Sequence, residues 1–251
     1  MAKIVSIHSF RPGTGKSCVA ANIATVLAAT GQRVGIIDSD VHAPNIHRLF
    51  GVDEAAISHS LNDFLWGKCR IAQTAHDISR HISAHLKGMI YLIPFTTTAG
   101  ELDYDISLLS DSFQMLVAEL ALDVLLIDTQ SGLDQTTLPT LAFSDVQLVI
   151  LRPDDRDYQG TSVALDVAHH LGIPAMMLVV NEVPATFDAL DVRHEVEAVY
   201  GCEVVAVLFH AEEMATLPKA GLFVMYYPTH SITIELTRVA AILSGAGSAV
   251  A

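Results

Sequence analysis

The sequence predicts a single α/β domain, residues 1–251, in which one doubly wound and mostly parallel β-sheet carries helices on both faces. The chain of 251 residues has the length of one large domain. Apolar residues make up 51% of it and charged residues 17%, which excludes a disordered chain and allows a substantial buried core. Short apolar runs alternate with longer stretches of helical spacing, and this alternation is typical of a parallel sheet wound in both directions.

Seven short apolar runs are predicted to form the strands. They are rich in Val, Ile and Leu at successive positions, as expected for strands that are buried on both faces. The runs are Lys3–His8, Arg33–Asp38, Met89–Pro94, Asp123–Asp128, Val146–Leu151, Ala175–Asn181 and Val204–Phe209. Helices are expected between many of them, at Lys16–Ala29, Asp105–Ala121, Tyr158–Leu171, Asp188–Tyr200 and, at the end, Ile232–Leu243. In the last helix, apolar residues recur at helical spacing, which predicts a stripe that faces the core.

Residues 51–88 are the least regular part of the chain. We expect one short helix there, around Ser60–Trp66, and interpret the segment as an irregular insertion on the domain and not as a domain of its own. Residues 245–251 are small and uncharged, and we expect them to form a flexible tail.

The first predicted strand runs into Ser9-Phe-Arg-Pro-Gly-Thr-Gly-Lys-Ser17, and a helix follows. A Gly-rich turn between a strand and a helix places backbone N–H groups and the positive end of the helix dipole around an anion. Lys16 is expected to reach the terminal phosphates of a nucleotide, and Ser17 to ligate Mg²⁺. The strict pattern begins with Gly six positions before Lys16, where this chain has Phe10. The residues predicted to bind the phosphates are Gly13, Thr14, Gly15, Lys16, Ser17 and Cys18.

Three carboxylates follow two other predicted strands. Asp38 and Asp40 lie at the end of the second strand, and Asp128 at the end of the fourth. Because the carboxyl ends of parallel strands face the same crevice, we expect these side chains to gather beside the phosphate loop. Carboxylates in such a place hold Mg²⁺ and orient an attacking water molecule, so Asp38 and Asp128 are predicted to belong to the metal site.

These features resemble the MinD/ParA family of P-loop ATPases, which carry a deviant form of the Walker A phosphate loop. The resemblance extends over nearly the whole chain. It includes the phosphate loop, a first switch at Asp38-Ser-Asp40, a second switch at Asp128-Thr-Gln-Ser-Gly132, and the apolar run Met177–Val180 that closes on Asn181. The fold that the resemblance implies is that of a P-loop NTPase.

The resemblance also implies the cofactors ATP and Mg²⁺ and a role for each site residue. Lys16 and Ser17 would be phosphate and Mg²⁺ ligands, Asp40 would orient the hydrolytic water, and Asp128 would be the acidic residue behind the metal. The residues implied for the base are Asn181, beside the adenine ring, and Phe209, His210 and Ala211, which would line the base mainly through their backbone.

The chain departs from the family in the first half of the loop. Family members typically carry Lys-Gly-Gly there, and the Lys crosses an ATP-bound dimer to touch the partner's nucleotide. This chain has Arg11-Pro12-Gly13. Arg11 keeps the positive charge and is predicted to act as an arginine finger. Pro12 removes a backbone donor and stiffens the loop where two subunits would approach. An ATP-dependent homodimer remains the expectation.

The function that we expect is that of a slow, partner-stimulated and Mg²⁺-dependent ATP hydrolase, which acts as a nucleotide-dependent dimerisation switch and positions or regulates a partner assembly. Two alternatives stay open: an ATP-dependent biosynthetic ligase of the dethiobiotin or cobyrinate type, and an ATP-binding module that does not hydrolyse. An iron–sulfur carrier is not expected, because Cys18, Cys69 and Cys202 are scattered along the chain.

Charge and chain ends indicate a protein partner. The net charge is −14; residues 126–251 carry five Lys or Arg against 16 Asp or Glu, which does not suit non-specific DNA binding. The end of the chain is short and uncharged, so we expect no amphipathic membrane anchor. No apolar stretch approaches the roughly 18 residues of a membrane span. The first residues lead directly into a strand without a signal peptide, which predicts a cytoplasmic location.

Overall fold

The computed structural model describes residues 2–96, 108–134, 137–218 and 221–245. Its centre is one eight-stranded sheet in the order β3-β4-β2-β5-β1-β6-β7-β8. The strands are β1 (Lys3–His8), β2 (Arg33–Asp38), β3 (His76–Asp77), β4 (Met89–Ile93), β5 (Val124–Asp128), β6 (Val146–Leu151), β7 (Ala175–Val183) and β8 (Glu203–Phe209). The strand pairs are parallel except that β3 runs antiparallel to β4. The predicted mostly parallel sheet is confirmed.

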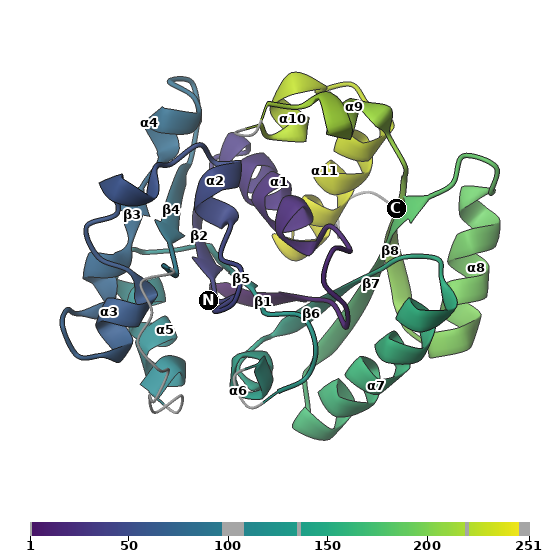
Figure 1. Ribbon diagram of the computed structural model, residues 1–251, viewed down its shortest axis with the longest axis horizontal. Helices are drawn as coiled ribbons and strands as arrows, with labels where there is room; N and C mark the ends of the chain where they lie inside the picture. Colours follow the sequence, from purple (N-terminus) through teal and green to yellow (C-terminus); the bar gives the residue numbers. More distant parts are fainter. Residues whose placement is uncertain (1, 97–107, 135–136, 219–220, 246–251) are drawn as a thin grey trace.

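Helices lie on both faces of this sheet (Figure 1). The longer ones are α1 (Lys16–Ala29), α5 (Leu108–Glu119), α7 (Asp155–Leu171), α8 (Ala189–Tyr200) and α11 (Ser231–Leu243). The shorter ones are α2 (Ile46–Leu49), α3 (Leu61–Leu65), α4 (Ser79–Ile82), α6 (Thr137–Ala142), α9 (Glu212–Thr216) and α10 (Phe223–Tyr226), with 3-10 turns at Glu54–Ala56 and Ile71–Thr74.

Successive strand residues point to opposite faces of the sheet, so the hydrophobic core consists of separate clusters on the two faces. Val5 and Ile7 of β1 belong to a fully buried cluster with α1 and α11. Leu125 of β5 packs on the opposite face with α5, and Val149 of β6 packs with α7. Side chains on both faces of the sheet are therefore buried from water. This explains why the strands consist of nearly continuous apolar residues.

Most differences from the predicted boundaries have a local cause. β7 continues two residues beyond Asn181, through a register shift in its pairing with β8. α7 starts at Asp155, three residues earlier than predicted, because the Asp154 side chain accepts the N–H groups of Arg156 and Asp157 and caps the helix. The first three residues of the predicted helix Asp105–Ala121 lie outside the described residues.

Residues 51–88 pack onto the edge of the sheet. The short helix expected around Ser60–Trp66 is α3, and Leu61 and Ile71 join the buried cluster of α5. β3 adds an antiparallel edge strand that sequence analysis missed, because a strand of two residues is too short to show a hydrophobic pattern. Of the predicted tail, only Gly245 lies within the described residues. In the described part of the chain, no helix combines the length and apolar character needed to cross a bilayer.

Candidate functional site

The phosphate loop joins the end of β1 to the start of α1. Gly13 and Gly15 have φ angles of 79° and 89°, in the left-handed region that other residues rarely adopt. A Cβ atom on Gly15 would also lie 2.3 Å from Asn181 Nδ2. Among the residues that the structure describes, no side chain caps the start of α1, so the N–H groups of its first turn remain available to an anion.

A hollow of about 280 Å³ lies over this loop. It brings together the loop, the segment that follows β2 and the segment that follows β5, so three strand ends meet at one place. All six residues predicted to bind phosphates line it. The lining residues are Pro12, Gly13, Thr14, Gly15, Lys16, Ser17, Cys18, Asp40, Ala43, Asn45, Leu49 and Ser131.

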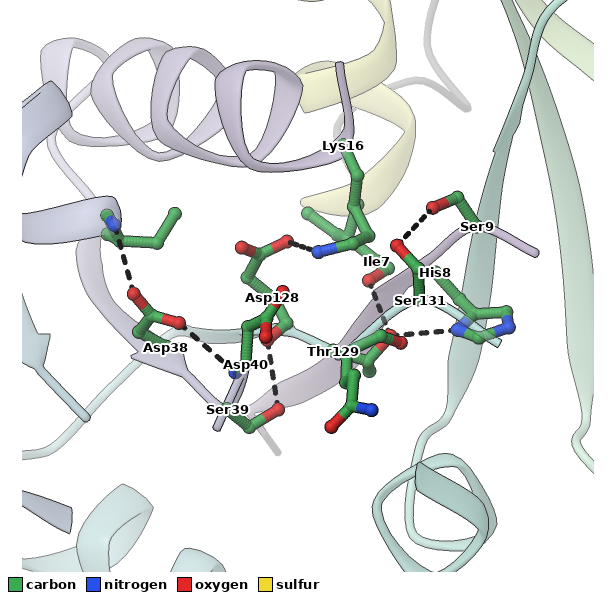
Figure 2. Close-up of polar contacts among 12 residues, drawn as sticks. Ile7, His8, Ser9, Lys16, Asp38, Ser39, Asp40, Asp128, Thr129 and Ser131 are labelled. Atoms are coloured by element: carbon green, nitrogen blue, oxygen red, sulfur yellow. Dashed lines mark hydrogen bonds and ion pairs between the residues drawn. The ribbon is translucent and has the colours of Figure 1, made fainter. Parts of the chain in front are cut away.

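Lys16 points from the start of α1 toward Asp128 at the end of β5 (Figure 2). Lys16 Nζ lies 2.7 Å from Asp128 Oδ1, and the two side chains are 5% and 1% exposed. Burial raises the pKa of Asp128, and the positive charge of Lys16 opposes this rise. Each charge depends on the other, because an unpaired charge is costly at this depth. A phosphate in the hollow would offer Lys16 a second anionic partner.

Asp38 lies beside Asp128, since the two are register partners on β2 and β5. The Asp38 carboxylate is fully buried and accepts backbone N–H groups from Asp40, Asn45 and Ile46 at 3.2, 2.8 and 3.0 Å. Burial, and then the negative charge of Asp128, raise the pKa of Asp38 to about 7. Its oxygens therefore shape the segment after β2, and its expected place in a metal site stays a prediction.

Asp40 lies at the mouth of the hollow and is partly exposed. Its Oδ1 accepts the N–H groups of His42 and Ala43 at 3.1 and 3.0 Å. This fixes the direction of the carboxylate relative to the phosphate loop. The structure thus gives Asp40 access to a water molecule in the hollow, while its role in hydrolysis stays a prediction.

The oxygen donors around Lys16 fit Mg²⁺. Among the described residues, Asp128 Oδ2 has no hydrogen-bond partner although it is buried. Ser17 lines the hollow one position beyond Lys16. Mg²⁺ binds through one or two protein oxygens and completes its shell with water and phosphate oxygens. Ser17 and Asp128 meet that requirement more directly than Asp38, whose oxygens already accept three backbone N–H groups.

The segment Thr129–Gly132 is hydrogen-bonded to the end of β1, and sequence analysis did not single out the residues that hold it there. His8 Nδ1 lies 2.8 Å from Thr129 Oγ1, which in turn donates to the carbonyl of Ile7 or of Gln130. Ser9 Oγ lies 3.1 Å from Ser131 Oγ (Figure 2). The available signal was a histidine at the end of the first strand, directly before the phosphate loop.

A second hollow, of about 310 Å³, contains all four residues that were predicted to surround the base. Its lining residues are Asn181, Glu182, Phe209, His210, Ala211, Met214, Ala215 and Ile232. Asn181 Nδ2 donates to the Thr14 carbonyl at 2.7 Å, so this side chain joins the second hollow to the phosphate loop.

Sequence analysis missed Glu182 in this second hollow. The residue has a φ of 59°, which is unusual for a side chain of its size. Its Oε2 lies 3.5 Å from Arg152 Nη2 and 3.3 Å from His210 Nδ1. The ends of β6, β7 and β8 are thus linked by one carboxylate.

Cys18 lies in the first turn of α1. Burial raises the pKa of its thiol to about 11, so the side chain is a neutral thiol at physiological pH. Its carbonyl accepts Asn22 Nδ2 at 2.8 Å. Cys18 therefore contributes packing and backbone to the loop.

Arg11 does not line the hollow. Its Nη2 lies 3.1 Å from Asp154 Oδ2 and its Nε 2.7 Å from Asp157 Oδ1, both in the loop and first turn that lead into α7. The neighbouring Pro12 is exposed and lines the hollow. The predicted contact of Arg11 with a partner's nucleotide would require these two ion pairs to open.

Known proteins are similar to this chain in sequence and in fold. A family model for ParA, described as the NUBPL iron-transfer P-loop NTPase, matches residues 1–81. An uncharacterized ATP-binding protein of Methanocaldococcus jannaschii is 25% identical over 98% of this chain and 89% of its own length. The septum site-determining protein MinD of Bacillus subtilis is 24% identical over 90% and 87%.

Solved structures of MinD proteins superpose on nearly the whole chain. The MinD cell division protein of Aquifex aeolicus has a TM-score of 0.81 at 18% identity, covering 97% of each chain. MinD of Pyrococcus horikoshii, solved as a complex with Mg-ADP, has a TM-score of 0.78 at 20% identity and covers both chains completely. The phosphate loop, the two strand ends that carry carboxylates, and the similarity in sequence and fold over nearly the full length together support a P-loop ATPase of the MinD/ParA family.

Proposed function

We propose that this protein binds Mg-ATP and hydrolyses it, and that the nucleotide controls whether two copies of the chain associate. The observation that carries the proposal is the buried Lys16–Asp128 pair beneath the hollow of the phosphate loop. This pair offers a cation to a phosphate and a carboxylate oxygen to a metal at the same point. The Mg-ADP bound to MinD of Pyrococcus horikoshii supports the same class of ligand here.

Each residue at the hollow has a task in this proposal. The backbone N–H groups of Gly13–Ser17 surround the phosphates, and Lys16 neutralises the transferring phosphoryl group. Ser17 and Asp128 would hold Mg²⁺, which when bound neutralises charge on the phosphate oxygens. Asp40 orients the attacking water molecule from the mouth of the hollow. Catalysis is then mostly a matter of position and electrostatics.

The segments after Asp40 and Asp128 are the proposed moving parts. The Lys16 ammonium that now pairs with Asp128 would turn toward a phosphate, and this changes the partner of the carboxylate where the second segment begins. That segment is joined to the loop by two short contacts, Gly132 N to Ser9 O at 3.0 Å and Ser131 Oγ to Ser9 Oγ at 3.1 Å. Binding and hydrolysis would therefore reorder a surface segment, as other nucleotide switches do.

The proposed partners are a second copy of the chain and a protein whose position or assembly the switch regulates. The acidic balance of residues 126–251, with five basic residues against 16 carboxylates, supports a protein partner over DNA or an anionic membrane. We propose that hydrolysis is slow alone and stimulated by that partner.

Other functions of the fold are less well supported. A ligase would need a second substrate beside the terminal phosphate, and ATP turnover that appears only with a small carboxylic acid would favour it. A module that binds ATP without hydrolysis would show no turnover at all. An iron–sulfur role is not proposed, because Cys18, Cys69 and Cys202 come from α1, from the loop before Ile71 and from the turn before β8.

Titration calorimetry with Mg-ATP tests the proposal. The Lys16→Ala variant should bind at least about 100-fold more weakly, since it lacks the cation at the phosphates. Because Lys16→Ala leaves the buried Asp128 unpaired, Lys16→Ala/Asp128→Asn is measured beside it, with circular dichroism to establish the fold of both. Lys87→Ala, at an exposed position after α4, is the control. Wild-type affinity in the folded Lys16 variants would refute the proposal.

A further inference from the structure

The first half of the phosphate loop, Ser9–Arg11, is attached to α7, although α7 begins almost 150 residues later in the chain. Two different interactions make this attachment, one ionic and one apolar. We call them together the loop–α7 contact: the ion pairs of Arg11 with Asp154 and Asp157, and the packing of Phe10 against Gly160.

The ionic part is held by a buried carboxylate. Asp157 is 2% exposed, and its Oδ2 accepts the N–H group of Arg152 at 2.9 Å. Its Oδ1 faces Arg11 Nε at 2.7 Å. Burial raises the pKa of Asp157, whereas the N–H bond of Arg152 and the charge of Arg11 oppose the rise. A carboxylate at this depth needs a cation, and Arg11 is the cation within contact distance among the described residues.

The apolar part explains why this chain has Phe10 where the strict loop pattern has Gly. Gly160 lies inside α7, where Gly costs about 1 kcal/mol relative to Ala. A Cβ atom there would lie 2.0 and 2.3 Å from two ring atoms of Phe10 and 2.8 Å from its Cβ. The absence of a side chain at Gly160 therefore makes the space that Phe10 fills.

The same three loop residues are attached on their other side to the segment that follows Asp128. Ser9 Oγ donates to the Arg11 carbonyl at 2.9 Å and lies 3.1 Å from Ser131 Oγ. The Ser9 carbonyl accepts Gly132 N at 3.0 Å. The loop is thus fixed between α7 and the second switch, while the residues from Pro12 onward face the hollow.

We propose that Asp157 and Gly160 are positioning residues of the nucleotide site, which act through Arg11 and Phe10 to hold the phosphate loop in its binding conformation. This rests on the proposed function, since it concerns the affinity of the same loop for a nucleotide. In this arrangement Arg11 supports the loop of its own chain. A preformed loop binds phosphate without first having to be ordered, so loss of the contact lowers affinity.

A double-mutant cycle on the affinity for Mg-ADP, measured by calorimetry, tests the ionic part. Asp157→Asn keeps the acceptor for Arg152 N–H and removes the charge, and it should raise the Kd about tenfold. Arg11→Gln should raise it similarly, and the double variant should be no weaker than the weaker single variant. Asp155→Asn, exposed in the same helical turn, should match wild type.

The apolar part is tested by a second double-mutant cycle. Gly160→Ala should raise the Kd for Mg-ADP at least tenfold, because the new Cβ displaces Phe10. Phe10→Gly, which removes the packing without a clash, should raise the Kd similarly, and adding Gly160→Ala to it should raise the Kd little further because no clashing atom remains. All variants are checked by circular dichroism and thermal unfolding. A folded Gly160→Ala or Phe10→Gly variant with wild-type affinity, or two losses that add up in the double variant, contradicts the proposal.

Two results separate this inference from the proposed function. If wild-type protein binds no Mg-ADP, the proposed function itself fails. If it binds and Asp157→Asn binds equally well, only the positioning role fails. ATP-dependent association that increases in Asp157→Asn and decreases in Arg11→Gln would also overturn it. In that case Asp157 would hold Arg11 away from the partner subunit, and the ion pair would not support the loop.

Discussion

Lowering the pH should destabilise the fold through His8. The imidazole is fully buried at the end of β1 and bonded to Thr129 through Nδ1. Burial, and then the charge of Lys16, lower the pKa of His8 from 6.5 to about 3. The folded state therefore keeps the ring neutral, whereas the unfolded chain takes up a proton below about pH 6.5. The stability that this difference provides is fully present above pH 6.5 and is lost as the pH falls toward 3.

The size of the effect follows from the two pKa values. Between pH 7 and pH 5 the unfolded chain gains about 0.7 proton at His8 that the folded chain does not bind. The free energy of unfolding should fall by about 2 kcal/mol over this range because of His8 alone. A folded-state pKa of about 4 would give nearly the same value, since the ring would still be neutral at pH 5.

Urea unfolding at pH 7, 6 and 5 measures this contribution. His8→Asn removes the titration while its amide keeps a donor for Thr129 Oγ1. Between pH 7 and pH 5 the stability of wild type should fall relative to His8→Asn by about 2 kcal/mol. His194→Asn, which removes an exposed imidazole from α8, is the matched control. Parallel pH profiles for wild type and His8→Asn would refute the assignment of a neutral buried imidazole.

Three further predictions concern the site and its partners. Asp40→Ala should keep the wild-type affinity for Mg-ATP in calorimetry and lose at least about 100-fold of the phosphate-release rate, because Asp40 is proposed to orient water and not to hold the nucleotide. Asn181→Ala should weaken Mg-ATP binding about tenfold, since the Thr14 carbonyl loses its 2.7 Å bond and the loop loses a support; unchanged affinity would show that the bond does not matter. Gel shifts with long duplex DNA and cosedimentation with anionic liposomes should both be negative with ATP at about 0.15 M salt. Strong ATP-dependent binding in either assay would contradict the proposal that the partner is a protein.

The part of the site that depends on strand order could be predicted from the sequence. Because parallel strands end in Asp38 and Asp128, both carboxylates lie at one edge of the sheet, independently of how the helices pack. In the structure these two residues are register partners on β2 and β5. The phosphate loop likewise follows from a local pattern of strand, Gly-rich turn and helix. These predictions need only neighbouring residues and the direction of the sheet.

The part that depends on contacts between distant segments could not be predicted. The partner of Arg11 is set by the position of α7, and this position depends on a cap at Asp154 that moves the helix start. The backbone N–H groups that the Asp38 carboxylate accepts come from residues up to eight positions later, which no local pattern indicates, and its place in the metal site stays a prediction. Helices of four to six residues, such as α2 and α9, show too little periodicity to be recognised.

The mass of the Asp40→Ala protein in solution, measured by light scattering with Mg-ATP and with Mg-ADP, tests the nucleotide switch most directly. Because this variant should bind ATP without consuming it, the ATP complex persists during the measurement. The switch predicts twice the mass of one chain with Mg-ATP and the mass of one chain with Mg-ADP. The same mass with both nucleotides, at protein concentrations well above the Kd for each, would contradict nucleotide-controlled dimerisation, and Pro12 would then be the first residue to replace by Gly.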